Sequence, residues 1–419
     1  MNVEENIELK LRNNIGITIV SLVITIIVLL MLAGVALNFA LGEDGIFRKA
    51  KKATEIYQNA QIAEEKELEN ISKYINEYLN GSIDGEDEEK VKLSDVEKAI
   101  EDGTIFKENT ILKDKFDNEI KIPKDFKLAI DSGKTVIDGI VIEDVNAGDN
   151  KSIGNQYVWI PIGDINVNEN KDVETIEFGR YSFDEITGKE KLEQSADRYT
   201  EEIAIQDRYY EYITSKYDNV VAKDLAGFIT KAKSSKGFYI GRYEVGDEEA
   251  VEARNFTDDE PHISQTPVVK KEKWPYTCIS QPQAANLARR MYANNDNIVS
   301  DLINSYALDT TMVFIQRFSG DSDYSKQLGE NTKSELNKTG ESILKSDNKL
   351  DMRCNIYDIA GNTYEWTTES SAHISAHCVS RGGICKLKGD LEFSAADRHI
   401  YNADGFDGNL DSFRTILYL

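Results

Sequence analysis

Residues 357–367 read YDIAGNTYEWT, a stretch that predicts a turn followed by a strand. Gly361 and Asn362 both tolerate a positive φ, so together they predict a tight turn. Side chains alternate between the two faces of a strand, and the strand after the turn therefore places Tyr364 and Trp366 on the same face. We expect these two aromatic residues to lie in the core.

A charged residue of the same strand, Glu365, points to the opposite face. Alternatively, Glu365 pairs with an arginine such as Arg381 or Arg414. The two glycines that follow Arg381, Gly382 and Gly383, allow two backbones to approach closely or a strand to bend. We therefore interpret these residues as structural rather than catalytic.

The sequence on either side of this stretch predicts short strands and a few helices. Aromatic and β-branched runs at 157–161 (YVWIP) and 237–245 (GFYIGRYEV) are typical of strands. The charged segment 194–232 and the apolar spacing within 300–316 indicate helices. The segment 280–293 (SQPQAANLARRMYA) predicts another helix, because a serine followed by an early proline is typical of a helix start.

Taken in order, these pieces resemble the sulfatase-modifying-factor family, that is, formylglycine-generating-enzyme-like domains, which share a variant of the C-type lectin fold. The family's glycine before Phe413 is replaced here by Ser412. The resemblance implies a C-type-lectin-like domain over 151–419. It rests on Phe238-Tyr239-Ile240-Gly241-Arg242-Tyr243-Glu244-Val245, Ser280 with Ala284, Gly361-Asn362-Thr363-Tyr364-Glu365-Trp366, Arg381-Gly382-Gly383 and Phe413-Arg414.

The cysteines bear on whether this domain is an enzyme. Catalytic members of the family use a pair of cysteines just beyond the Arg-Gly-Gly strand to bind copper. Here Cys385 follows Gly383 by two positions, no further cysteine follows it, and Cys378 lies upstream. We therefore predict no catalytic residues. The cysteines form either a disulfide or buried thiols, and among the possible pairings we favour the one that joins Cys378 to Cys385. An enzyme of the same superfamily with a chemistry other than copper oxidation is the alternative.

In lectin-fold proteins the segment between the Arg-Gly-Gly strand and the last strand lies on the ligand-binding face, and here this resemblance implies 384–411. Aromatic side chains interleaved with short polar ones are typical of recognition surfaces. The expected ligand is a glycan, a protein or a phage, and the same fold and position serve as the variable region of proteins diversified by mutagenic retroelements. Arg398 is expected, by resemblance, to anchor the scaffold. The candidate ligand-binding residues are Phe393, Asp397, His399, Tyr401, Asn402, Asp404, Phe406 and Asn409.

Two groups of side chains suggest metal binding. His373 and His377 are four residues apart, as two metal ligands on a helix can be, but no carboxylate that would orient them is identifiable. An oxygen-rich run suits calcium but lacks the ligand order and distal glutamate of an EF-hand. We favour a solvated loop and predict no metal or other cofactor, with calcium as the alternative. The oxygen-rich run consists of Asp404, Asp407, Asn409 and Asp411.

The N-terminal part of the chain has a different character. No charged residue occurs in 13–42, and a helix over 17–42 would exceed the roughly 30 Å hydrocarbon layer of a membrane. A polar leader that ends at Gly16, followed by Ile17, resembles the type IV prepilin and pseudopilin N-terminus, where a peptidase cuts after the glycine. The glutamate usual at the fifth mature position is Ser21 here, which favours a minor or tip subunit or a simple anchor. The resemblance implies a single-pass cell-membrane protein with an extracellular C-terminal domain. Membrane lipid and pilin-like subunits are the implied partners.

The sequence as a whole predicts the α+β class: a long N-terminal transmembrane and amphipathic helix followed by a C-type-lectin-like globular domain. Apolar residues at three- and four-residue steps indicate that the helix continues beyond the membrane. An acidic linker and short strand-like pieces follow it. The expected segments are a leader at 1–16, a transmembrane helix at 17–42, an amphipathic helix at 43–81, a linker and β-rich collar at 82–150, and the lectin-like domain at 151–419.

The composition excludes several function classes. The chain has 49 Lys and Arg against 74 Asp and Glu, a net charge of −25, which repels phosphate backbones, and we expect no nucleic-acid partner. The sequence has no P-loop, dinucleotide-binding fingerprint, nucleophile elbow or His-Glu-x-x-His motif. The leading hypothesis is a surface-exposed, membrane-anchored or pilus-associated protein that displays a ligand-binding domain for adhesion, and a purely structural pilin is the alternative.

Overall fold

The computed structural model describes eleven stretches of the chain, and the first of them begins at residue 93. These stretches belong to a compact unit, Val91–Leu419. The predicted leader, transmembrane helix and amphipathic helix at 1–16, 17–42 and 43–81 lie outside the described residues. The described residues are 93–145, 153–193, 197–200, 203–206, 225–252, 266–328, 343–346, 351–371, 378–384, 393–401 and 410–419.

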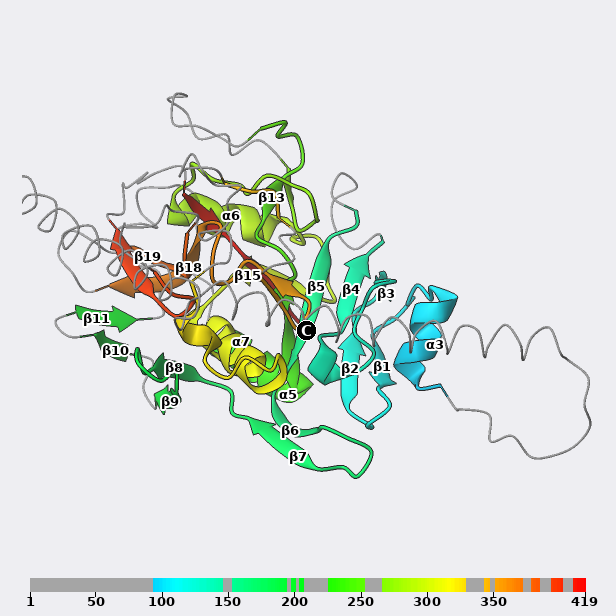
Figure 1. Ribbon diagram of the computed structural model, residues 1–419. Coiled ribbons are helices and arrows are strands. Elements are labelled where there is room, and N and C mark those ends of the chain that lie inside the picture. Colours follow the sequence, from blue (N-terminus) through cyan, green and yellow to red (C-terminus); the bar gives the residue numbers. More distant parts are fainter. Residues whose placement is uncertain are drawn as a thin grey trace, which may run out of the picture. The chain divides into compact units, whose positions relative to one another are not determined.

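A six-stranded antiparallel sheet has the strand order β15-β22-β12-β5-β4-β3 (Figure 1). The strands predicted at 157–161 and 237–245 are confirmed as β5 and as β12, which ends at Gly241. Two of the strands, β3 and β4, come from the segment expected to form a collar, and they extend the same sheet as β5. The bounds are β3 Phe126–Leu128, β4 Val141–Asp144, β5 Gln156–Pro161, β12 Gly237–Gly241, β15 Val299–Leu302 and β22 Thr415–Tyr418.

Both faces of this sheet are buried, because alternate side chains of its central strands enter two different hydrophobic cores. Trp159 and Tyr239 pack together on one face, with ring centroids 4.9 Å apart. Phe238 points to the other face, where its ring centroid lies 5.5 Å from that of Phe228 in helix α5, Leu225–Ser235. Burying large aromatic side chains on both faces supplies much of the favourable free energy of folding.

A second six-stranded sheet has the order β10-β11-β18-β19-β20, and β21 pairs in parallel with β18. A helix is predicted over 194–232. This prediction is wrong for β10 and β11, which form a hairpin, and is confirmed for the part that lies in α5. Tyr, Thr and Ile in DRYT and IAIQ favour extended backbone over helix. The bounds are β10 Asp197–Thr200, β11 Ile203–Gln206, β18 Tyr364–Ser371, β19 Cys378–Arg381, β20 Arg398–Tyr401 and β21 Asp411–Phe413.

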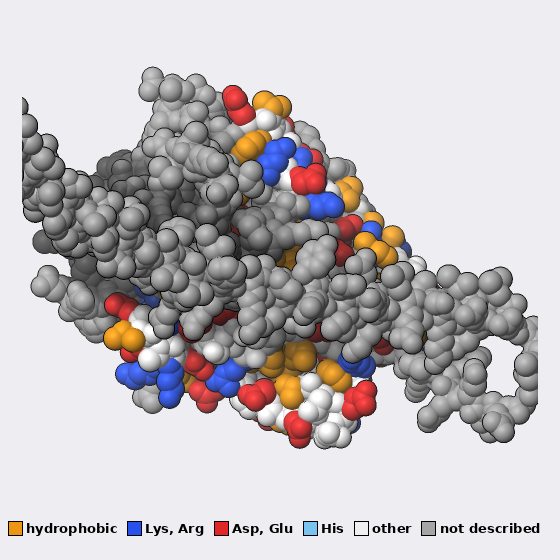
Figure 2. All heavy atoms as spheres, in the orientation of Figure 1, with side chains coloured by type: hydrophobic (Ala, Val, Ile, Leu, Met, Phe, Trp, Pro, Cys, Tyr) orange, Lys and Arg blue, Asp and Glu red, His pale blue; other side chains and the backbone are white. Residues whose placement is uncertain are grey.

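Smaller elements surround the two sheets. The 3₁₀ turns are η1 Val136–Asp138 and η2 Tyr324–Lys326. Figure 2 shows acidic and basic side chains interspersed among the described residues of one face. The two-stranded pairs are β1 Thr110–Lys113 with β2 Glu119–Ile122, β6 Gly163–Asn166 with β7 Val173–Ile176, β8 Arg180–Phe183 with β9 Glu190–Glu193, β13 Gly246–Asp247 with β14 Pro267–Val268, and β16 Met352–Arg353 with β17 Ile356–Tyr357.

Helix starts follow from local hydrogen bonding. The helix predicted at 280–293 is confirmed as α6, Gln281–Arg290, and the backbone N–H of Ser280 donates to Gln283 Oε1 at 3.0 Å. The helix predicted within 300–316 is α7, Ser305–Phe318, where Asn304 Oδ1 accepts from the backbone N–H of Ala307. The remaining described α-helix is α3, Asp95–Asp102.

The structure corrects the predicted fold class and location. The described chain is mainly β, and the longest of its four α-helices, α7, has 14 residues, which is about 21 Å at 1.5 Å per residue. None of the helices in the described residues is long and apolar enough to cross a membrane. The prediction of an α+β protein built on a long transmembrane helix, the single-pass membrane location and the pilin-like assignment are therefore wrong and are not used below. The predicted cleavage site, Gly16 and Ile17, lies outside the described residues.

Candidate functional site

The turn before β18 is held by side chains on both sides. Asn362 has a φ of 67°, as the sequence predicts for this turn. Its Oδ1 accepts from the backbone N–H of Leu344 at 2.8 Å, and its Nδ2 donates to the Leu344 carbonyl at 3.1 Å. The backbone N–H of Thr363 donates to Glu244 Oε1 at 3.0 Å. The turn thus joins the segment after β12 to the start of β18.

Glu365 pairs with Arg414, one of the two arginines expected from the sequence. Arg414 Nε donates to both carboxylate oxygens, at 2.9 and 3.0 Å. The same guanidinium donates to the carbonyl oxygens of Gly241 and Tyr357, at 2.8 Å each. Both side chains are buried, so the pair joins β18, β12 and the last two strands and is not exposed to a ligand.

A second buried carboxylate, Glu244, lies beside this pair. It accepts hydrogen bonds from Asn362 Nδ2 and from the hydroxyl and backbone N–H of Thr363. Burial and the neighbouring charge of Glu365 raise the pKa of Glu244 to about 8. Burial also raises the pKa of Glu365, although Arg414 opposes this shift. Glu244 therefore keeps its proton at neutral pH.

A buried ion network joins helix α7 to strands β18, β19 and β20, and Arg180 of β8 adds to it. Arg381 Nη1 lies 2.6 Å from Glu369 Oε1, and its Nη2 lies 2.8 Å from Asp309 Oδ1. Arg398 Nε donates to Glu369 Oε2 at 2.8 Å and its Nη2 to Asp309 Oδ2 at 2.9 Å. Arg180 Nη2 approaches Glu369 at 3.5 Å. The four main side chains are at most 4% exposed, and the anchoring role expected for Arg398 is confirmed.

The two glycines after β19 allow a close approach of backbones. A Cβ on Gly383 would lie 2.1 Å from the carbonyl oxygen of Ala360 and 2.8 Å from that of Phe393. Gly382 has a φ of 87°, and a Cβ there would lie 2.7 Å from the carbonyl oxygen of Ile359. Side chains are therefore excluded at both positions, as the sequence predicts.

Three rings gather on the side of β20 that faces away from the ion network. We call Tyr364, Phe393 and His399 the aromatic group. The His399 ring centroid lies 4.4 Å from that of Tyr364 and 4.3 Å from that of Phe393. His399 follows Arg398, and successive strand residues point to opposite faces. Burial lowers the pKa of His399 to about 4, and its Nε2 has no hydrogen-bond partner among the described residues.

The structure describes the side chains of only three of the eight candidate ligand-binding residues. Phe393 and His399 come together in the aromatic group. Asp397 Oδ2 accepts from the backbone N–H of Ser394 at 2.7 Å, so this side chain closes the turn before β20. Tyr401 contributes backbone to β20, opposite Cys378. The candidates outside the described residues are Asn402, Asp404, Phe406 and Asn409.

Two other predictions also concern residues that lie in part outside the description. Cys378 is buried in β19, whereas Cys385 is outside, so their disulfide stays a prediction. His373 and His377 are outside as well. Within the described stretches, no cluster of three His, Cys, Asp or Glu side chains is arranged to hold a metal. The prediction that the protein uses no cofactor remains untested.

The sequence reading missed the acidic half of the ion network. Asp309 lies 60 positions from Glu369, so no local motif connects them. A signal was available at Asp309, because it is the acidic residue within the otherwise apolar and small run ALDTTMVFI of a predicted core helix. A carboxylate in such a position requires a buried cation.

Comparison with known proteins adds little. No family model matches the chain, and no curated protein matches it. A solved structure described as the crystal structure of CarF is 14% identical to this chain, with a TM-score of 0.30. The match covers 62% of this chain and 98% of the CarF chain. A score this low carries no argument about fold or function, so the argument for function depends on the site itself.

Proposed function

We propose that this chain is a binding protein that recognises a macromolecular partner through the segment between β19 and β21. The observation that carries this proposal is the ion network of Asp309 and Glu369 with Arg381 and Arg398, which fixes the strands below the aromatic group. A recognition surface benefits from a rigid base, because less conformational freedom is then lost on binding.

The chemistry of the motif residues supports binding over catalysis. Glu365, Arg381 and Arg414 are buried and already have charged partners, so they are not available to a substrate. The residues predicted to extend the surface at the end of β20 and after it include Tyr401 and Phe406, and rigid aromatic side chains contribute large contact areas at low entropic cost. The resemblance to formylglycine-generating-enzyme-like domains is consistent with this proposal and remains a prediction.

A position-specific crosslinking experiment in the native cells tests the proposal. A photoreactive phenylalanine analogue replaces Tyr401 in the full chain, and in a control it replaces Ile130, which is 84% exposed and distant in sequence from the proposed surface. We expect a discrete adduct only from position 401. Excess unlabelled wild-type protein should suppress it, and the Phe393→Ala variant should compete less well.

Two outcomes would overturn the proposal. One is an adduct pattern that is the same at 401 and 130, or that Phe393→Ala protein suppresses as well as wild type does. The other is turnover of candidate peptide substrates by the purified protein, with or without copper, because the chain would then be an enzyme.

A further inference from the structure

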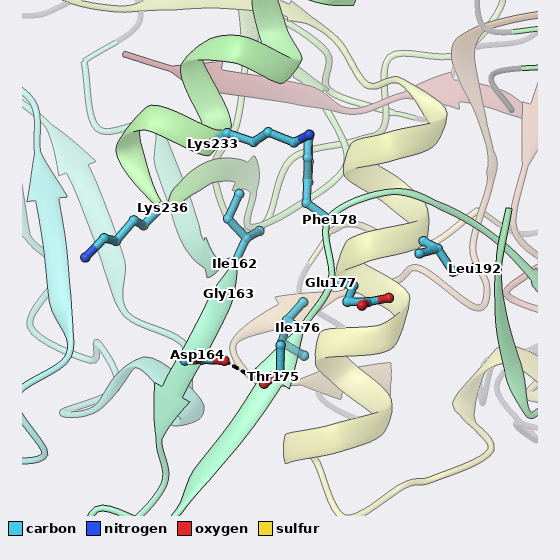
Figure 3. Close-up of a pocket in the computed structure, with 10 residues that line it drawn as sticks. All are labelled: Ile162, Gly163, Asp164, Thr175, Ile176, Glu177, Phe178, Leu192, Lys233 and Lys236. Carbon is cyan, nitrogen blue, oxygen red and sulfur yellow. Dashed lines mark hydrogen bonds between the residues drawn. The ribbon is translucent and has the colours of Figure 1, made fainter. Parts of the chain in front are cut away.

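A pocket of about 640 Å³ lies apart from the ion network and the aromatic group (Figure 3). Its walls come from the end of β5, the β6–β7 hairpin, strand β9 and the end of helix α5. In the space-filling view, apolar side chains gather in this region of the described surface (Figure 2). Pockets of this volume are typical of small-molecule sites.

The floor of the pocket is apolar and already in place. Ile162 is 8% exposed and Ile176 is fully buried. The ring of Phe178 lies 5.7 Å from that of Phe228 and 5.6 Å from that of Tyr306, between centroids. Gly163 also lines the pocket, and a Cβ built there would meet no atom within 4 Å. An apolar ligand body would therefore find a rigid surface without rearrangement of the protein.

The charged side chains around the floor differ in whether another described residue already binds them. Asp164 Oδ1 already accepts a hydrogen bond from the Thr175 hydroxyl at 2.7 Å. The side chain of Lys236 points away from the floor (Figure 3), and its Nζ lies 3.8 Å from Glu119 Oε2. Lys233, in the last turn of α5, makes no ion pair or hydrogen bond with the described residues and extends over the pocket toward Phe178 (Figure 3).

The opposite side of the pocket is acidic. Glu177 lines it together with Asp164, and Figure 3 shows the Glu177 carboxylate turned toward Leu192. A ligand with one negative group at Lys233 is attracted there, whereas a second negative group at the far side would meet like charges. The arrangement therefore selects for a single anionic group at one end of an apolar body.

We propose that this pocket binds small amphipathic monoanions, that is, molecules with an apolar, aromatic body and one carboxylate, sulfonate or similar group. The body contacts Ile162 and Phe178, and the anionic group pairs with Lys233. The site is independent of the binding surface at β20.

Fluorescence titration of the full-length protein tests this site with two probes of the same shape. 1-Anilinonaphthalene-8-sulfonate carries one sulfonate, and N-phenyl-1-naphthylamine has the same rings without it. We expect Lys233→Gln to weaken binding of the sulfonate about tenfold, the loss typical of one charge-assisted hydrogen bond. Binding of the neutral probe should stay unchanged. Lys231→Gln, on the same helix but outside the pocket lining, is the matched control.

A second pair of variants tests the location. Thr175→Trp fills the pocket and should abolish binding of both probes, whereas Val173→Trp, on the same strand but outside the lining, should not. Thermal unfolding curves establish that each variant is folded. The proposal is overturned if Lys233→Gln and Lys231→Gln bind the sulfonate equally, or if Thr175→Trp binds both probes as the wild type does. Because Lys233 is exposed, the lysine pair decides the question even if Thr175→Trp fails to fold.

Discussion

Arg381 and Arg398 lie directly opposite each other on the antiparallel strands β19 and β20. Like charges in this position normally destabilise a sheet. Here both guanidinium groups bind the same two carboxylates, Asp309 and Glu369, so each arginine has two charged partners and each carboxylate has at least two. The cross-strand arginine pair therefore serves as a clamp between the sheet and helix α7.

Replacing one member of this network should lower the stability of the protein considerably. We expect Arg381→Met to lower the free energy of unfolding by about 3–5 kcal/mol, because two buried carboxylates would each lose a partner. Arg317→Met removes a partly exposed arginine that pairs with Glu174 and Glu190, and it should cost at most about 1 kcal/mol. Urea denaturation of the two variants measures the contrast. Equal losses would show that the buried network contributes no more than a surface ion pair.

The raised pKa of Glu244 predicts a pH dependence of stability. The native state keeps the Glu244 proton up to about pH 8, while the unfolded state releases it near the ordinary value of 4.5. The native state therefore binds more protons in this window, and its stability falls as the pH rises from 4.5 to about 8. Glu244→Gln cannot release a proton, so its urea midpoint should fall less between pH 5 and pH 8. Parallel pH profiles for variant and wild type would exclude this role for Glu244.

Two glycines with similar φ angles allow the cost of a positive φ to be separated from the cost of a close contact. Gly382 has a φ of 87° and Gly320 a φ of 79°, but only a Cβ on Gly382 would meet another atom, the Ile359 carbonyl oxygen at 2.7 Å. Alanine at either position incurs the left-handed penalty of about 1–2 kcal/mol. We expect Gly382→Ala to cost about 1–3 kcal/mol beyond Gly320→Ala, from the overpacked contact. Thermal or urea unfolding gives the difference, and a value near zero would contradict the close approach.

His399 should titrate well below the ordinary histidine range. Burial lowers its pKa to about 4, so the ring is neutral at pH 7. The unfolded state binds the proton first as the pH falls, and the stability that the neutral ring contributes is lost between pH 6.5 and about 4. NMR titration of the imidazole signal, assigned by its absence from His399→Gln protein, measures this value. A midpoint near 6.5 in the native protein would mean that the ring is solvated.

Local features of the fold could be predicted from the sequence. The positive φ at Asn362, the alternation around Glu365 and the start of α6 at Ser280 depend on residues within a few positions of each other, and each agrees with the structure. The hairpin β10–β11 is hard to predict, because charged residues surround its Tyr, Thr and Ile, which favour strands.

The candidate site could be predicted only in part. Phe393 and His399 were singled out, but their contact with Tyr364 depends on the pairing of three strands, which no short window of sequence contains. The partners Asp309 and Glu369 were missed for the same reason. The pocket at Lys233 draws its walls from segments 162–164, 175–178 and 192, and nothing in any one of them indicates a cavity.

The ion network has a consequence for fragments of the chain. Asp309 lies on one side of the segment 310–368, and Glu369, Arg381 and Arg398 lie on the other. A polypeptide divided within that segment would carry Arg381 and Arg398 on one piece and Asp309, with which both arginines pair, on the other. Neither piece would then bury all of its charged groups with a partner, so we expect the chain to fold only when it is intact across this segment.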